Sequence, residues 1–286
     1  MQKTLKLAKF DAILSTDVCN TRVNADLTLV LRLGFRQINP AAGAASGSYN
    51  DYGDATATPR KIIRWDSASW AAWKQNFCNS AERFWHGRFW LLNNLGIFPY
   101  QVPGKIMIPN FYCRFRLQGS DASAGHHHHV IDVVRLDPTE TWFGSHSTLY
   151  DNLDTRPTVK GTDRAGKPIV QRAHVHEVGH LMGLGHVDIG KAHCPATGDT
   201  NASRCYGVSD FDKNSVMGQG MQLRGVHAQP WFEALKRFRV AEPPSKLYQP
   251  EAKFVKQIAP STRRHYPRTV AEFEAGTQLL SLPAGR

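Results

Sequence analysis

The sequence has no long apolar run. Its 286 residues are 41% hydrophobic, yet no stretch approaches the roughly 18 consecutive apolar residues that suggest a membrane-spanning helix, so no transmembrane segment is expected. The N-terminal stretch also lacks the apolar core of a Sec signal peptide, because Lys6, Lys9 and Asp11 interrupt it. The location therefore stays open: the protein remains in the cytoplasm as made, leaves by a non-classical route, or has lost a leader.

Cysteine is scarce. The five cysteines are an odd number without a CxxC pair, which excludes the common structural zinc ribbons. Cys194 and Cys205 flank a short polar loop, where a disulfide would bring a modest entropic gain, and the sequence leaves that bridge open. Cys19 could be an inhibitory zinc thiolate from an N-terminal prosegment, but no surrounding motif supports this reading.

Nucleic-acid-binding motifs are missing despite a net charge of +11. The basic residues are dispersed, and the chain shows neither a helix-turn-helix pattern, nor zinc-finger spacing, nor an RNP-like aromatic strand. We interpret the charge as solvated surface and expect no nucleic-acid partner, while acidic or cell-surface partners stay open. An affinity for DNA or RNA that falls steeply with salt concentration would be needed to support a nucleic-acid-binding function.

The sequence pattern predicts a strand, then a helix, then further strands before the motif. Residues 27–35 alternate between apolar and other side chains, which predicts a half-buried strand, and Asp66 or Ser67 should cap a helix with an inward stripe. That stripe consists of Trp70, Trp73, Phe77, Ala81 and Phe84. Two strands are expected at 111–117 and 130–136, and a loop is expected at 155–168. One helix is expected in the first part of 169–186 and another at 229–238.

Three histidines are spaced to reach one metal ion in the run HEVGHLMGLGH. On a helix, His176 and His180 lie about 40° apart and one turn apart. If the helix continued, His186 would point about 80° away from His176 and lie far along the axis. The chain must therefore turn, and Gly183 or Gly185 can adopt the left-handed conformation that ends a helix.

These residues carry the chemistry of a catalytic zinc site. Three neutral imidazoles leave a fourth position for water, and Glu177, which follows the first ligand, can take the proton of that water as general base. From the composition of this chain, chance would produce the five fixed positions with a probability on the order of 10⁻⁴. The sequence thus predicts Zn²⁺ held by His176, His180 and His186.

The HExxHxxGxxH pattern resembles the metzincin metallopeptidases. The resemblance implies a methionine in a tight turn beneath the metal, and Met217 in the run NSVMG fits that place without ligating zinc. It also implies an α+β fold: a twisted mixed β-sheet, an active-site helix above the cleft, and a smaller C-terminal subdomain with the Met-turn and a helix. Some metzincins add a tyrosine ligand two places after the methionine, where this chain has Gln219.

The predicted organisation has three parts: an N-terminal extension at 1–26, a metzincin-like catalytic domain at 27–240, and a basic proline-containing tail at 241–286. The predicted function is that of a zinc-dependent endopeptidase acting on a protein or peptide substrate, which lies extended along an edge strand. The alternative is a catalytically inactive, zinc-stabilised binding or toxin module, against which the intact Glu177 argues. The oligomeric state is not indicated.

Other polar residues near the motif have simpler readings. His174 lies nearly opposite His176 on a helix and is interpreted as a surface or core histidine rather than a ligand. The run His126–His129 is interpreted as a polar strand edge or a weak chelating patch. Asp188 is either an acceptor for a ligand imidazole N–H or a turn residue, and the sequence does not decide between these.

Overall fold

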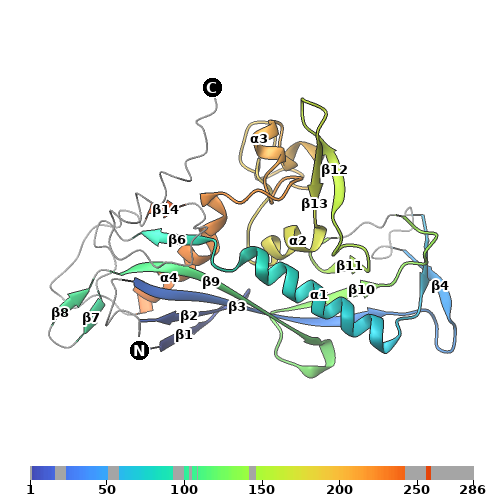
Figure 1. Cartoon of the computed structure of the whole chain (residues 1–286), viewed down its shortest axis with the longest axis horizontal. Helices are drawn as coiled ribbons and strands as arrows, with labels where there is room; N and C mark the ends of the chain where they lie inside the picture. Colours follow the sequence, from blue (N-terminus) through green and yellow to red (C-terminus); the bar gives the residue numbers. More distant parts are fainter. Residues whose placement is uncertain are drawn as a thin grey trace. The chain divides into compact units, whose positions relative to one another are not determined.

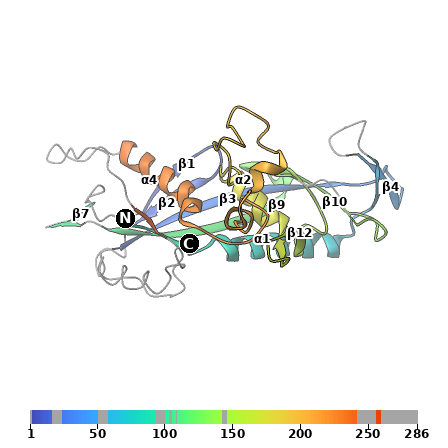
Figure 2. The same cartoon turned by 90° about the horizontal axis from the view of Figure 1, so that it is seen from above.

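The chain has the expected α+β fold with a mixed sheet (Figures 1 and 2). In the described residues, strands outnumber helices. The computed structural model describes residues 2–16, 24–50, 58–92, 100–102, 105–107, 109–141, 146–241 and 256–258. The chain divides into two compact units. The first unit comprises Met1–Leu31, Phe84–Arg116 and Leu223–Arg286, and the second comprises Arg32–Arg83 and Leu117–Gln222. No helix in the described ranges is long and apolar enough to cross a membrane.

The first unit is built on strands in the order β1-β2-β3-β9-β6-β14. Their bounds are β1 Gln2–Lys6, β2 Asp11–Ser15, β3 Asn24–Ile38, β6 Phe89–Leu92, β9 Asn110–Asp121 and β14 Lys256–Ile258. The pairs β1–β2, β2–β3, β6–β9 and β6–β14 are antiparallel. A hairpin of β7 (Tyr100–Val102) and β8 (Lys105–Met107), the 3-10 turn η5 (Gly225–Ala228) and α4 (Gln229–Ala241) complete the described elements of this unit.

Strand β3 confirms the strand expected at 27–35. Leu27, Leu29 and Leu31 are fully buried whereas Thr28 between them is half-buried, because successive side chains of a strand point to opposite faces. The helix expected at 229–238 is α4. Trp231 in its first turn is fully buried, and its indole Nε1 donates to the carbonyl of Arg114 at 2.7 Å, so the polar edge of this core side chain is satisfied.

The second unit combines parallel strands, hairpins and helices. Its elements are β4 Ser46–Tyr49, β5 Arg60–Ile63, α1 Ser67–Trp85, η3 Ala122–Ala124, β10 His129–Val134, β11 Leu149–Asp151, β12 Thr158–Thr162, β13 Pro168–Gln171, α2 Ala173–Leu181, η4 Ser203–Tyr206 and α3 Asp210–Lys213. The C-terminal part of β3 pairs with β10, and β10 pairs with β11, both in parallel. The β4–β5 and β12–β13 pairs are antiparallel hairpins.

Helix α1 begins at the predicted place and buries the predicted aromatic stripe. Asp66 caps it, because its Oδ1 accepts the backbone N–H of Ser69 at 2.8 Å. Within the second unit, the ring of Phe77 lies 5.2 Å from the rings of both Phe35 and Tyr150. The end of the stripe differs from the prediction: Phe84 is only partly buried.

A hairpin occupies the segment 155–168 that was predicted to be a loop, so that prediction was wrong. The turn residues form only its tip, where Asp163 Oδ1 accepts the N–H groups of Ala165 and Lys167 at 3.0 and 2.8 Å and Gly166 has φ of +77°. The segment TVKGT before the tip, with three β-branched residues, forms β12. Figure 1 shows β12 and β13 above α2, and β13 leads directly into that helix.

Four further predictions concern the ends of the chain and the C-terminal subdomain. Cys19 lies outside the described residues, as does the tail beyond Ala241 except for β14. The segment taken as an N-terminal extension contains β1 and β2, which pair with each other and with β3. The expected Met-turn lies in the second unit whereas α4 lies in the first, although the resemblance grouped them in one C-terminal subdomain.

Replacing Phe77 with alanine should lower the free energy of unfolding by about 3–5 kcal/mol, because the ring is fully buried and its loss leaves a cavity among aromatic neighbours. Chemical denaturation measures the change. The control is Gln75→Ala on the exposed side of α1, which should stay within about 0.5 kcal/mol of the parent. Equal losses for the two variants would contradict the assignment of the buried face.

Candidate metal centre

Helix α2 places the first two histidines of the motif on one face. The ring centroids of His176 and His180 lie 4.6 Å apart, and their Nε2 atoms lie 3.0 Å apart. His176 is buried and His180 is half-buried. The helical spacing of four residues therefore brings both imidazoles to one point, as the sequence predicts.

Gly183 turns the chain so that the third histidine joins them. Helix α2 ends at Leu181, and Gly183 follows with φ of +100°, in the left-handed region that glycine tolerates best. The N–H of Leu184 then reaches back to the carbonyl of Gly179 at 3.0 Å. This turn brings Nε2 of His186 to 3.0 Å from Nε2 of His180. The ligand atoms of the three histidines all lie within 4.8 Å of one another, which is close enough to bind one metal ion.

Backbone carbonyls determine which nitrogen of each ring carries the proton. The Nδ1 atoms of His176, His180 and His186 lie 2.7, 2.8 and 2.7 Å from the carbonyl oxygens of Val216, Leu184 and Thr200. A carbonyl oxygen only accepts, so each Nδ1 is the donor and each neutral ring presents a bare lone pair at Nε2. Three lone pairs that face one another cannot form hydrogen bonds among themselves. A bound cation satisfies all three, so the donor set fits a metal ion.

Burial keeps these rings neutral. It lowers the pKa of His180 to about 4, holds that of His176 well below its usual value, and lowers that of His186. Repulsion between neighbouring imidazolium charges lowers the pKa values of His176 and His180 further. A neutral imidazole is the form that binds metal, so no proton has to be displaced at neutral pH.

Glu177 is not committed to another side chain. The residue is half-buried, and its carboxyl group forms no hydrogen bond within the described ranges. Burial, and then the charge of Asp154, raise its pKa to about 8 against the opposing effect of Lys160. A cation held by the histidines would pull this pKa down again. The carboxyl group is therefore available for proton transfer beside the three histidines.

The turn predicted around Met217 is present and is hydrogen-bonded to Val187, the residue after the third histidine. The N–H groups of Gly218 and Gly220 both donate to the carbonyl of Ser215, at 2.9 and 3.0 Å. The carbonyl of Met217, whose side chain is buried, accepts the N–H of Val187 at 3.0 Å. The turn thus borders the segment that carries the third histidine. Support of the rings by the Met217 thioether remains a prediction.

Gln171 is a site residue that the sequence analysis missed. This buried side chain at the end of β13 donates from Nε2 to the carbonyls of Gly218 and Gly220, at 2.9 and 3.2 Å, and lies 3.3 Å from Nδ1 of His176. It joins the strand that precedes α2 to the turn that holds His176. The only sequence signal is alternation, which places Gln171 on the same face as the buried Ile169.

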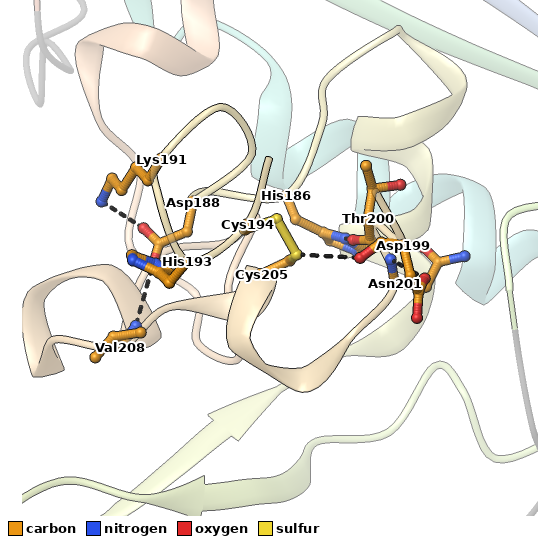
Figure 3. The surroundings of a disulfide bond; sticks show 10 residues. All are labelled: His186, Asp188, Lys191, His193, Cys194, Asp199, Thr200, Asn201, Cys205 and Val208. Atoms are coloured by element: carbon orange, nitrogen blue, oxygen red, sulfur yellow. Dashed lines mark hydrogen bonds and ion pairs between the residues drawn. A yellow bond between two sulfur atoms is a disulfide. The ribbon is translucent and has the colours of Figure 1, made fainter. Parts of the chain in front are cut away.

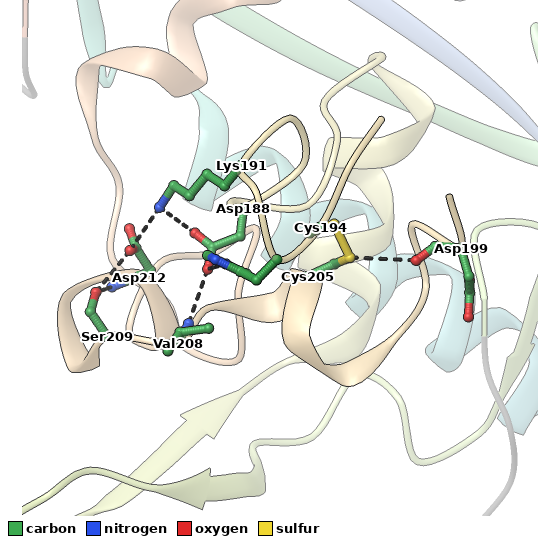
Figure 4. A network of polar contacts seen from close by, with 9 residues as sticks. Asp188, Lys191, Cys194, Asp199, Cys205, Val208, Ser209 and Asp212 are labelled. Carbon is green, nitrogen blue, oxygen red and sulfur yellow. Dashed lines mark hydrogen bonds and ion pairs between the residues drawn. A yellow bond between two sulfur atoms is a disulfide. The ribbon is translucent and has the colours of Figure 1, made fainter. Parts of the chain in front are cut away.

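Asp188 anchors the loop that follows the last histidine rather than a ligand imidazole. Its fully buried carboxylate accepts from Lys191, from His193 Nε2 at 2.8 Å and from the N–H of Val208 at 3.0 Å (Figure 3). Figure 4 shows the contacts with Lys191 and Val208 from close by. These hydrogen bonds lower the pKa of Asp188 against the opposing effect of burial. Of the two readings that the sequence left open, the structure supports a role in the loop.

A disulfide closes this loop. Cys194 and Cys205 are bonded, with their Cα atoms 5.3 Å apart, which answers a question that the sequence left open. Figure 3 shows the bond beside the segment that carries His186 and Thr200.

The remaining histidines near the motif are not ligands of this centre. His174 is buried, with Nε2 2.6 Å from Ser80 Oγ and Nδ1 3.0 Å from the carbonyl of Asp154. Of the two interpretations, a surface or a core histidine, the structure supports the core histidine. The run His126–His129 does not join the centre. In the described part of the chain, only the three motif histidines gather closely enough to form a metal-binding group.

Comparisons with known proteins do not assign a family. A scan against protein-family models, a search of curated proteins and a search of solved structures each find no match. The chemistry that the centre can perform is therefore indicated by its own residues alone.

Replacing Gln171 with leucine should lower the free energy of unfolding by about 1–3 kcal/mol, because buried carbonyls of the turn lose their donor. Thermal or chemical denaturation of metal-free protein measures the effect. Gln222→Leu is the matched control, since the same change is made on an exposed side chain and should cost no more than about 0.5 kcal/mol. Parental stability of the Gln171 variant would refute this role.

Proposed function

We propose that the centre binds zinc and that the protein is a zinc-dependent endopeptidase of the metzincin type. The observation that carries the proposal is the convergence of three Nε2 lone pairs beside an uncommitted glutamate. Imidazole suits several transition metals, and a set of three protein ligands with an open position is typical of catalytic zinc. When bound, zinc supplies a Lewis acid that polarises a carbonyl group and lowers the pKa of water.

Glu177 moves the protons of the proposed reaction. Its carboxylate accepts a proton from the attacking water, which makes the water oxygen a nucleophile toward the peptide carbonyl. The same carboxyl group then returns the proton to the leaving amine nitrogen. The absence of any hydrogen bond from the Glu177 carboxyl group to the described residues leaves its oxygens available for both transfers.

The β12–β13 hairpin is the proposed support for an extended substrate. Within the described ranges β12 pairs only with β13, so the hairpin offers a strand edge with unpaired backbone groups. A peptide can add to such an edge as a further strand. The hairpin borders the centre: Gly161 on β12 lies so close to the Gln219 side chain that a Cβ there would meet its Oε1 at 2.8 Å.

Two variants separate catalysis from metal binding. Glu177→Gln keeps the size of the side chain but cannot accept a proton, so peptide hydrolysis should fall by at least about 10²-fold while zinc content and folding match the parent. His180→Ala removes a ligand and should lose both zinc and activity. Cleavage of a peptide library, together with elemental analysis, gives both measurements.

The pair also tests the alternative of an inactive binding module. Such a module would keep its function in Glu177→Gln and lose it only in His180→Ala, when the metal leaves. Parental hydrolysis by the Glu177 variant would show that another group is the base, and the proposed mechanism would fall.

A further inference from the structure

Tyr206 packs against the third histidine of the centre. Its ring centroid lies 3.8 Å from that of His186 with 36° between the ring planes, and 5.9 Å from that of His176 with 16° between the planes. The tyrosine is half-buried, and its hydroxyl group forms no hydrogen bond within the described ranges. Its contact with the centre is therefore made by the flat face of its ring.

The loop that carries Tyr206 contacts the His186 imidazole a second time. The carbonyl of Thr200 lies 2.7 Å from Nδ1 of His186, so one loop meets the ring both at its edge and at its face. The ring has two soft torsions, and the second is broad for histidine. Both contacts together restrict the direction in which Nε2 points.

The Cys194–Cys205 disulfide fixes the position of this loop. Cys205 precedes Tyr206 in the 3-10 turn η4, and both sulfurs belong to fully buried residues. The carbonyl of Cys205 also accepts the N–H of Asp188 at 3.1 Å, which joins η4 to the backbone two residues after His186. The disulfide and the hydrogen bond of Cys205 thus hold the position of Tyr206, the next residue in the chain.

His186 needs such support more than the other two ligands. His176 and His180 share helix α2, whose backbone hydrogen bonds fix their spacing. His186 follows the end of the helix in a segment of turns. Restraint of this ring must therefore come from residues distant in sequence.

We propose that Tyr206 is a positioning residue for His186, and that the disulfide-closed loop 194–205 maintains it, so that metal affinity depends on both. The proposal rests on metal binding by the three histidines, which is one part of the proposed function, and not on peptide hydrolysis. Removing an outer partner of a metal ligand typically costs 10–100-fold in metal affinity.

The test is Zn²⁺ and Co²⁺ affinity of the metal-stripped full chain. Tyr206→Phe keeps the flat ring and should bind both ions within about 3-fold of the parent. Tyr206→Met, which fills a similar volume without a ring, should bind them about 10-fold or more weakly, as should Cys194→Ser combined with Cys205→Ser. The Co²⁺ absorption bands should also shift in the Met variant, because the geometry of one nitrogen ligand changes.

Tyr49→Leu is the control, since it removes another partly buried tyrosine that packs on a separate core cluster, and it should bind metal like the parent. Parental affinity and Co²⁺ bands in Tyr206→Met would overturn the proposal, as would an equal loss in the control. If the parent bound no metal, both this proposal and the proposed function would fall. If the parent bound metal and the variants showed the expected losses of affinity, but the parent cleaved no peptide, the proposed peptidase activity would fall and the role of Tyr206 would stand.

Discussion

The centre depends on one arrangement: each of the three imidazoles donates a hydrogen bond from its Nδ1–H to a backbone carbonyl and turns an unprotonated Nε2 toward the other two. The three carbonyls belong to Leu184 just after α2, to Thr200 in the disulfide-closed loop and to Val216 in the methionine turn. Those segments become neighbours only when the second unit folds. The fold thereby creates a cluster of lone pairs that is unfavourable alone and favourable around a cation. A cation bound by the three imidazoles would therefore stabilise this unit.

The rest of the second unit holds these segments in place. Helix α2 faces the centre with His176 and His180, and on its other side His174 bonds to Ser80 of α1 and lies 5.1 Å from the ring of Phe77. Gln171 joins the strand before α2 to the methionine turn. The buried Asp188 and the disulfide fix the loop that carries Thr200. Each contact restrains the backbone near a ligand, and none uses a group that the metal would need.

Local patterns predict local structure here and fail where contacts are distant in sequence. Alternation identified β3, helical periodicity identified α1, and a proline suited to a first helical turn favoured α4. The spacing of the motif predicted the shared face of α2 and a turn at Gly183 or Gly185, which the structure has at Gly183. The β12–β13 hairpin was missed because its tip is rich in turn residues and its strands are short. Gln171 and Tyr206 were missed because their partners lie 45–49 and 20–30 residues away. The disulfide could not be decided, since pairing depends on proximity in the folded chain.

Anomalous diffraction at the zinc absorption edge, from crystals of the zinc-loaded protein, tests the central claim most directly. The arrangement of the imidazoles predicts one strong peak in the described part of the chain, at about 2.0–2.1 Å from Nε2 of His176, His180 and His186. The three Nδ1 atoms should still face their carbonyls. A peak bonded to Nδ1 of any of these rings, or zinc held instead by the run His126–His129, would contradict the account.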